Sequence, residues 1–449
     1  MGSLPRLTLA LFCVGCGAVK DGQLADAPAA PEIDASGLDA APTSGLVKVT
    51  VLDPGGSGAP AVGATAVFIN PDDSVVKRAA TDSAGKAEAE VMIGASVTSI
   101  VLVGTTYQIQ SVLGVKPGDE IVLGTRTTDS TSAGSMTVTF PTLIGTTFYE
   151  ITGPCGSSRF DPPVGPPPPT VSQVLTFQAH CKLSPMEIVV SAFDSADMVL
   201  QSVHKPGVVF VDGGAVAMPA YDGVRPFTGS YTNIDAIIVN ASMTRAVPDG
   251  TGRSIAGVEQ TTGATRMFSL TGPKATTARI DSSFSIASRS FQRVRQTLAG
   301  TAATYGLDVG ATLLPWLSGA PTFDPAAGKV TVPTDNTGTS GAKPDAFRLT
   351  ATYERADDGS KVTTTFRWTV FAEAPIDIKF PALPTDLGAL TPLATDTFSP
   401  MTATMFEADT VAGYDEARAD LNRAFTLFGG TRYPATTVRI SSSPSFRVF

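Results

Sequence analysis

Short segments in which apolar and polar residues alternate recur along most of the chain from position 45 onward. Segments 46–52 and 136–140 show this two-residue period, which sends successive side chains to opposite faces of a β-strand. The segments are separated by clusters of Gly, Pro, Asp and Asn, the residues that favour turns. The pattern therefore predicts many short strands connected by turns.

The clearest β-hairpin joins segments 347–353 and 362–370 through the residues Asp357, Asp358 and Gly359. Asp-Gly between two alternating segments is a strong local signal for a hairpin, because glycine accepts the left-handed backbone that the turn requires. We therefore expect these two segments to pair directly.

Helical periodicity is confined to two short segments, 291–298 and 415–425. In the second, Asp415 is placed to cap the helix, ahead of an apolar stripe that begins at Ala417. The sequence thus predicts an all-β, multidomain fold of tandem β-sandwiches, immunoglobulin-like or transthyretin-like, with one or two short helices in the C-terminal region.

Composition narrows the class of protein further. The length of 449 residues predicts about two to four domains. A hydrophobic content of 43% is too high for a disordered chain in which only 16% of the residues are charged. The net charge of −9 argues against nucleic acid as a partner, and two histidines leave little of the usual catalytic and metal-binding repertoire.

Residues 1–15 have the layout of a secretory signal peptide, with Arg6 ahead of the apolar segment 7–14. That segment is too short to span a bilayer as a mature helix. No later stretch approaches the ~18 continuous apolar residues that a membrane-spanning helix needs.

The end of this segment resembles the lipobox of bacterial lipoproteins, in which small residues precede a cysteine that is acylated before the signal is removed. Val14, Gly15 and Cys16 match that pattern, whereas Cys13 departs from it because leucine is usual there. The resemblance implies lipidation of Cys16. Gly17 after it resembles the class sorted to the outer membrane, so we expect a lipid-anchored protein of the bacterial cell envelope.

Residues 16–44 are mostly small and acidic and show neither helical nor strand periodicity. They are typical of a disordered Ala/Pro-rich tether between the lipid and the folded chain. Several acyl chains on one cysteine hold a protein stably, since each buried CH₂ contributes roughly 0.8 kcal/mol.

Segment 45–126 carries three matching elements. These are an alternating strand at 46–52, the pattern Pro-x-x-Gly-Ala-x-x-Val at 60–67, and the pattern Thr-Asp-x-x-Gly-x-Ala at 81–87. Together they resemble the carboxypeptidase regulatory-like domain, a small transthyretin-like β-sandwich. The resemblance implies a fold rather than an activity, and we expect Gly85 to occupy a left-handed turn position.

A Ser/Thr/Gly-rich stretch separates this segment from a second predicted β-sandwich, 135–228, with strands at 186–193 and 208–211. Its run of prolines at 166–169 is typical of a stiff, exposed polyproline loop. The remainder, 229–449, continues as a β-rich region of one or two domains.

Cys155 and Cys181 are the cysteines that remain once the signal is removed and Cys16 is acylated. An exported compartment favours a disulfide between them. The alternative is a nucleophilic pair of Cys181 with His180, but adjacent residues of a strand point to opposite faces. His204 is predicted to lie in a turn.

No catalytic, cofactor-binding or metal-binding residue is assigned, because the motifs of metalloproteases, α/β-hydrolases, P-loop proteins and dinucleotide-binding proteins are missing from the sequence. Acids in loops, such as Asp72 and Asp73 or Asp357 and Asp358, suit Ca²⁺ chemically but are typical of solvated turns.

Two classes of function stay open. The first is a non-catalytic structural or binding role at the envelope, with an envelope glycan or an envelope protein as ligand and the membrane contacted through the lipid. The alternative is a hydrolase of extracellular polymer that uses two carboxyl groups in the C-terminal region. An exposed row of aromatic side chains would favour the glycan.

Overall fold

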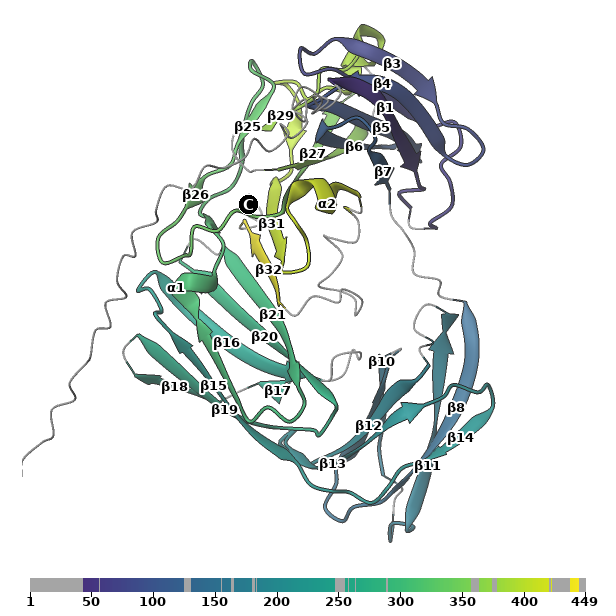
Figure 1. Ribbon diagram of the computed structural model, residues 1–449, viewed down its shortest axis with the longest axis vertical. Helices are drawn as coiled ribbons and strands as arrows, with labels where there is room; N and C mark the ends of the chain where they lie inside the picture. The colour runs from purple at the N-terminus through teal and green to yellow at the C-terminus, as the bar shows by residue number, and fades with distance from the viewer. Residues whose placement is uncertain are drawn as a thin grey trace, which may run out of the picture. The chain divides into compact units, whose positions relative to one another are not determined.

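The computed structural model shows an all-β chain whose strands form several packed sheets, as the alternating pattern predicts (Figure 1). All elements described here belong to the unit Thr43–Phe449. The structure describes residues 43–443 with the exception of 56, 125–130, 155, 163–164, 180–181, 183, 247–254, 257, 263, 288–289, 357–362, 374–377, 420 and 422–436.

The first part of the chain is a two-layer β-sandwich. One layer has the strand order β4-β1-β7, and the other begins with β3-β2-β5-β6. Val47, Val49 and Phe68 are fully buried between the layers. The strands are β1 (Ser44–Val51), β2 (Thr65–Ile69), β3 (Val75–Ala80), β4 (Lys86–Met92), β5 (Ala95–Val103), β6 (Thr106–Val115) and β7 (Glu120–Leu123).

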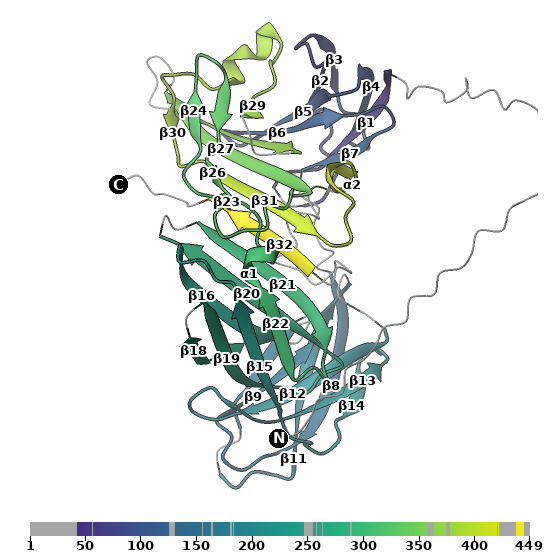
Figure 2. The ribbon, with the colours of Figure 1, turned by 60° about the vertical axis from the view of Figure 1, so that its left-hand side comes forward.

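The second layer does not stop at β6, because β6 pairs in parallel with β28 (Thr363–Ala372) of the C-terminal region. Within the described residues one sheet continues from β3 to β17, and Figure 2 shows part of it, with β31, β32, β21 and β20 side by side. The added strands are, in sheet order, β28, β27 (Ala346–Ala356), β31 (Thr402–Ala408), β32 (Thr437–Ser442), β21 (Phe291–Ala299), β20 (Thr277–Ile286), β16 (Ile238–Ala246) and β17 (Ile255–Ala256).

Strands β2, β5 and β6 are covered on both faces. One face packs on the first core, and the other packs on a second core that includes Ile109, Tyr353 and Trp368. Segments that follow β22 and β28 in sequence cover this second core with short elements. These are β23 (Trp316–Leu317), β24 (Thr322–Asp324), β25 (Lys329–Thr331), β26 (Thr334–Asp335), β29 (Ile378–Lys379), β30 (Thr397–Phe398) and the 3-10 helix η3 (Thr385–Leu390).

A second sandwich pairs the sheet β10-β9-β12-β13 with the sheet β11-β8-β14. Its core contains Phe140, Tyr149 and Phe177. All its strands come from one continuous stretch of chain: β8 (Ser132–Pro141), β9 (Phe148–Gly153), β10 (Gly156–Phe160), β11 (Thr170–Gln178), β12 (Met186–Phe193), β13 (Val199–Val208) and β14 (Gly214–Ala217). The prolines at 166–169 are exposed, as predicted.

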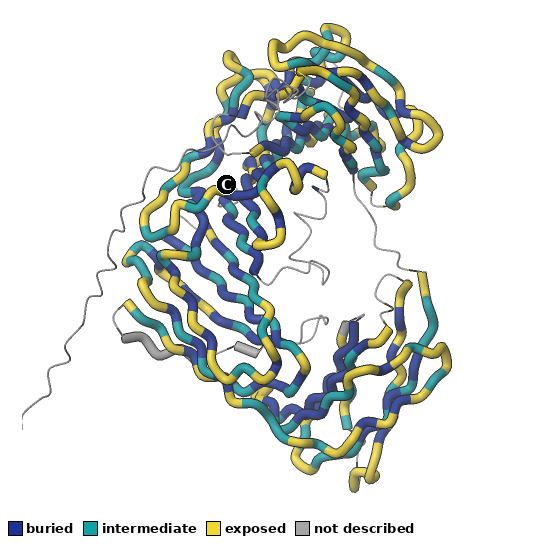
Figure 3. Tube along the Cα trace, viewed as in Figure 1, coloured by how far each residue is buried: buried dark blue, intermediate teal, exposed yellow. Residues whose placement is uncertain are grey.

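A third layer of strands, in the order β18-β19-β15-β22, shares a core with β16, β20 and β21 that includes Tyr231, Phe268 and Phe284. Along β20 every second side chain is buried, and Figure 3 shows this alternation in colour. The strands are β15 (Arg225–Thr232), β18 (Val258–Thr262), β19 (Thr265–Gly272) and β22 (Thr304–Asp308), and the helix α1 (Val309–Thr312) follows them.

Several sequence-based expectations are corrected by the structure. Segment 291–298 is not helical but forms strand β21, because β20 and β32 pair with it on both sides. His204 lies within strand β13 and not in a turn. That strand ends at Val208, so residues 209–211 of the expected strand 208–211 form a loop.

The beginning of the second expected helix, 415–425, is confirmed as α2 (Tyr414–Ala419), with Asp415 inside its first turn instead of at the cap. Residues 422–425 lie outside the described residues. The hairpin formed by 347–353 and 362–370 is confirmed as β27 and β28. In the described part of the chain, no helix has the length and apolar character needed to cross a membrane.

Candidate binding groove

A groove of about 680 Å³ lies where the first sandwich meets the C-terminal region. It is lined by loop 53–65, which joins β1 to β2, by the end of β5 with Tyr107 of β6, and by η3. This volume falls in the range of small-ligand sites, roughly 300–1,000 Å³. Because the lining comes from distant parts of the sequence, only the folded chain forms the groove.

Tyr107, which lines the groove, belongs to a row of stacked aromatic rings. Tyr107, Phe366 and Tyr353 lie at one register on the neighbouring strands β6, β28 and β27. The Tyr107 and Phe366 rings are stacked with centroids 5.5 Å apart, and Phe366 and Tyr353 are stacked at 4.9 Å. Each such pair contributes roughly 0.5–1.5 kcal/mol beyond its buried area. The row therefore holds the Tyr107 ring rigidly at the groove.

Helix η3 forms one wall of the groove and is held in place by two side chains of strand β27. The Tyr353 hydroxyl donates a hydrogen bond to the Leu390 carbonyl, and the Arg355 guanidinium donates to the carbonyls of Ala389 and Thr391. Arg355 also donates to both oxygens of the fully buried Asp396 carboxylate, at 2.6 Å each. These bonds raise the pKa of Arg355, so the pair remains ionised and the wall is held by charge-assisted bonds.

Loop 53–65 forms the opposite wall. The Asp53 carboxylate accepts hydrogen bonds from the Ser57 hydroxyl at 2.6 Å and from the Gly55 N–H at 3.0 Å. These bonds, the Ser57 bond above all, lower the pKa of Asp53. The carboxylate is therefore ionised at neutral pH and offers acceptor capacity at the edge of the groove.

The backbone behind this wall requires glycine at position 85. Gly85 has φ +71°, and a Cβ there would lie 2.4 Å from the Val51 carbonyl oxygen. Its left-handed conformation confirms the expectation from sequence. The Ala61 N–H donates to the same Val51 oxygen at 2.9 Å, which anchors the loop to strand β1.

Two exposed ion pairs connect the first sandwich to the C-terminal region beside the groove. Arg78 of β3 pairs with Asp386 of η3, and Asp73 pairs with Lys379. Asp72 accepts hydrogen bonds from the N–H and the hydroxyl of Ser74. The oxygens of Asp72 and Asp73 are thus engaged by a turn and by a lysine, while Asp357 and Asp358 lie outside the described residues.

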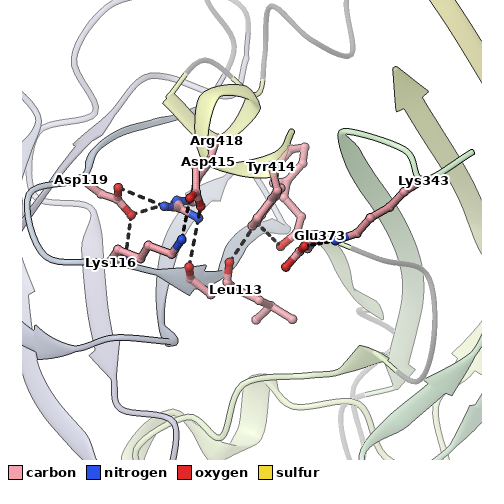
Figure 4. Close-up of polar contacts among 10 residues, drawn as sticks. Leu113, Lys116, Asp119, Lys343, Glu373, Tyr414, Asp415 and Arg418 are labelled. Carbon is pink, nitrogen blue, oxygen red and sulfur yellow. Dashed lines mark hydrogen bonds and ion pairs between the residues drawn. The ribbon is translucent and has the colours of Figure 1, made fainter. Parts of the chain in front are cut away.

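Helix α2 joins the same two parts of the chain through a buried arginine (Figure 4). Arg418 is 2% exposed and contacts the Asp119 carboxylate at 2.8 Å, the Asp415 carboxylate at 3.0 Å and the Gly114 carbonyl at 3.0 Å. Asp415 also pairs with Lys116 at 2.5 Å. We call these contacts the α2 clamp.

The groove contains acceptors, hydroxyls and one aromatic ring. Its polar lining consists of Asp53, Ser57, Thr65, Tyr107 and Asp386. A carboxylate with a lowered pKa, such as that of Asp53, is a poor proton donor at neutral pH. Among the described residues no cluster of His, Cys, Asp or Glu suits a metal ion. The described lining therefore offers hydrogen-bond acceptors, hydroxyls and one aromatic ring.

Among the described residues of the C-terminal region, the acids with a raised pKa are Asp345 and Glu407, and neither lines the groove. Burial raises the pKa of both. The Ala408 N–H donates to Asp345 at 2.8 Å, and Glu407 pairs with Arg439 at 2.5 Å. Both are engaged by the chain itself, so they do not form the open acid–base pair that the hydrolase alternative needs.

An exposed row of aromatic side chains is not found among the described residues, where both tryptophans are buried and Phe291, at 43%, is the most exposed large aromatic. This counts against a flat glycan-binding sheet face. Cys16, Cys155, Cys181 and His180 lie outside the described residues, so lipidation of Cys16 and the disulfide stay predictions.

The sequence alone did not single out Tyr107, Leu102 or η3. A partial signal existed, since Tyr353 and Phe366 stand at corresponding positions of the predicted hairpin. The pairing of β6 with β28 brings Tyr107 to them, and no local pattern indicates that pairing.

The fold and the groove together define an all-β protein of packed sandwiches with one groove of small-ligand size described at the junction of two of its parts. No protein-family model matches the chain, and no curated protein matches it.

Among solved structures, the chain is similar to the Bacillus anthracis TIE protein, with 14% identity, a TM-score of 0.15 and coverage of 59% of this chain and 50% of that one. It thus spans half the length of that protein. A putative adhesin from Bacteroides ovatus has 9% identity and a TM-score of 0.17, covering 59% of this chain and 92% of its own. Two B repeat units of the Staphylococcus aureus collagen binding protein have 11% identity and a TM-score of 0.13, over 80% and 92%. Such low scores do not establish a shared topology, so function is argued from the groove itself.

Proposed function

We propose that this protein is a lipid-anchored, non-catalytic binding protein of the bacterial cell envelope, and that the groove is its ligand site. Cys16 would carry the lipid, residues 16–44 would tether the folded chain, and residues 45–126 would supply a carboxypeptidase regulatory-like sandwich. The ligand would be a glycan or a protein of the envelope.

One observation carries the binding role: the groove walls are held in place by ring stacking and hydrogen bonds within the chain. Tyr107 is fixed by stacking, η3 is fixed by Tyr353 and Arg355, and Asp53 is fixed by its own loop. Rigid, preorganised walls lower the entropic cost of binding.

The location is tested by intact-mass measurement and membrane fractionation of the native protein and of a Cys16→Ser variant. We expect acyl mass and membrane association for the native chain and a soluble variant. Identical processing and solubility of the two proteins would disprove the anchor.

The binding role is tested with the soluble, full-length Cys16→Ser chain and isolated envelope material. Leu102 lines the groove and is 55% exposed, so Leu102→Glu obstructs the groove without disturbing the core. The matched control is Val103→Glu, since Val103 is 41% exposed on the opposite face of the same strand. Loss of binding in the first variant alone is expected, and equal binding by both variants would contradict the proposal.

A further inference from the structure

Strand β11 (Thr170–Gln178) lies at one end of the sheet β11-β8-β14. Its residues 170–177 are in regular antiparallel register with residues 134–141 of β8. Within the described residues, no strand pairs with its other edge. An edge of this kind presents backbone N–H and C=O groups to which a further strand can bind.

The composition of β11 differs from that of the other long strands at sheet ends. Its sequence, Thr-Val-Ser-Gln-Val-Leu-Thr-Phe-Gln, contains neither a charged residue nor a proline. In the described sheets, the other end strands of six or more residues are β3, β4 and β13, and each contains a lysine, namely Lys77, Lys86 and Lys205. Lysine at an edge protects a sheet from pairing with another chain. Strand β11 lacks this protection.

The strand is also complementary to a second copy of itself. Antiparallel pairing around a twofold axis at Val174, its central residue, would place Val174 opposite Val174 of the second copy. The same register would place Ser172 opposite Thr176 and Val171 opposite Phe177. Val174 is 52% exposed, so the pairing would bury an apolar side chain that faces solvent in the single chain. No charged group would meet its own copy.

Hydroxyl groups would continue across the contact between the two copies. The hydroxyls of Ser172 and Thr139, on the neighbouring strands β11 and β8, lie 2.7 Å apart. Ser172 and Thr176 are exposed. Thr176 of the second copy would therefore extend this row of hydroxyls beyond Ser172, and cross-strand pairs of this kind stabilise a sheet.

Both ends of β11 limit the length of the contact. The register with β8 shifts between Phe177 and Gln178, and prolines 166–169 precede the strand. The regular part that can pair, 171–177, is therefore symmetric about Val174. Because both copies would use the same edge, association would stop at the dimer.

We propose that the chain forms a twofold dimer in which β11 pairs antiparallel with β11 of a second copy, so that two sheets join into one. This inference goes beyond the proposed function and does not depend on the groove. A contact made by one pair of strands belongs to the small interfaces, below roughly 1,200 Å², so we expect a weak dimer with a micromolar dissociation constant.

The test is analytical ultracentrifugation of the full-length Cys16→Ser chain, which lacks the lipid that would itself cause association. We expect a reversible monomer–dimer equilibrium between about 1 and 200 µM. Val174→Lys and Val174→Glu should each weaken dimerisation at least tenfold, because like charges would face each other across the axis. An equimolar mixture of the two variants should restore the dimer, because opposite charges then meet.

The matched control is Val239→Lys, which should dimerise as the parent chain does. Val239 is 59% exposed and lies on β16, a strand inside its sheet. Circular dichroism checks that each variant is folded.

A dimer that persists in Val174→Lys, or a mixture of the two variants that stays monomeric, would overturn the inference. A parent chain that is monomeric over the whole range would also overturn it, and would leave an extended peptide of another protein as the candidate partner of this edge. The proposed function is judged separately, by binding of Leu102→Glu to envelope material.

Discussion

Gly85 and Gly63 have the same left-handed backbone but differ in their surroundings. Their φ angles are +71° and +74°. A Cβ at Gly85 would meet the Val51 oxygen at 2.4 Å, whereas a Cβ at Gly63 would have no neighbour within 4 Å. The two positions therefore separate the cost of backbone strain from the cost of a steric clash.

We expect Gly85→Ala to destabilise the protein by about 3 kcal/mol and Gly63→Ala by about 1 kcal/mol, because only the first adds a clash to the strain. Chemical denaturation of both variants measures the difference. Equal losses would show that the Gly85 site relaxes around a methyl group.

Arg245 is a buried charged side chain whose guanidinium makes few polar contacts with the described residues. It is 1% exposed, and its guanidinium donates to the Gly300 carbonyl at 3.2 Å and lies 5.0 Å from the Phe227 ring. Its Nη1 has no hydrogen-bond partner among the described residues. Burial, with a smaller effect of Arg225, lowers its pKa to about 10.

Replacing Arg245 with methionine should leave stability unchanged or raise it by about 1–2 kcal/mol, because an apolar side chain of similar length needs no desolvation compensation. Thermal unfolding of Arg245→Met beside the parent chain measures this. A marked loss of stability would mean that the guanidinium is better compensated than its contacts indicate.

Among the elements, α2 shows how a short helix connects distant segments. Tyr414 and Arg418 reach the carbonyls of Leu113 and Gly114 of β6 from one side of the helix. Ala417 and Leu421 pack on the first core. The helix is too short to be stable alone, so tertiary contacts supply its stability.

Arg418→Ala should destabilise the protein by about 2 kcal/mol, since it removes a buried side chain together with its hydrogen bonds to the Gly114 carbonyl and the Asp119 carboxylate. The control is Lys343→Ala, which removes the exposed pair with Glu373 and should change stability by less than about 0.5 kcal/mol. Denaturant midpoints of the two variants provide the comparison, and similar shifts would contradict a special role for the α2 clamp.

The α2 clamp should also weaken in acid. The hydrogen bond from Lys116, followed by the charge of Arg418, lowers the pKa of Asp415 in the folded state. Its contribution is therefore complete above the unfolded pKa, about 3.9, and is lost as the pH falls through the lower folded value. Stability of the native chain should approach that of Asp415→Asn below about pH 4, as measured by denaturation across pH. A constant difference between the two proteins would contradict this linkage.

At the scale of the whole molecule, the parallel pairing of β6 with β28 makes the first sandwich depend on the C-terminal region. Without β28, strand β6 would be an open edge, and Val67, Ile69 and Ile109 would lose the second core that covers them. The second sandwich differs, because all its strands come from residues 132–217 and its buried core comes from residues 136–218.

We therefore expect a fragment of residues 131–218 to fold alone and a fragment of residues 43–126 to aggregate or stay poorly ordered. Circular dichroism and amide dispersion in NMR spectra of the two fragments would distinguish these outcomes. A well-dispersed spectrum of fragment 43–126 would contradict this expectation, because it would show that the core of this fragment suffices for folding.

The sequence by itself determined the all-β class, the hairpin of β27 and β28, the left-handed Gly85 and the exposed proline loop, because each depends on residues close together in the chain. The helical prediction for 291–298 was wrong because eight residues of mixed polarity carry too little periodic signal, and pairing with β20 and β32 decided their conformation.

Only the tertiary structure decided where Tyr107 lies relative to Phe366 and η3. That arrangement depends on pairing between strands far apart in sequence, whose partners no local pattern specifies. The groove, and with it the proposed ligand, therefore follows from the pairing of β6 with β28.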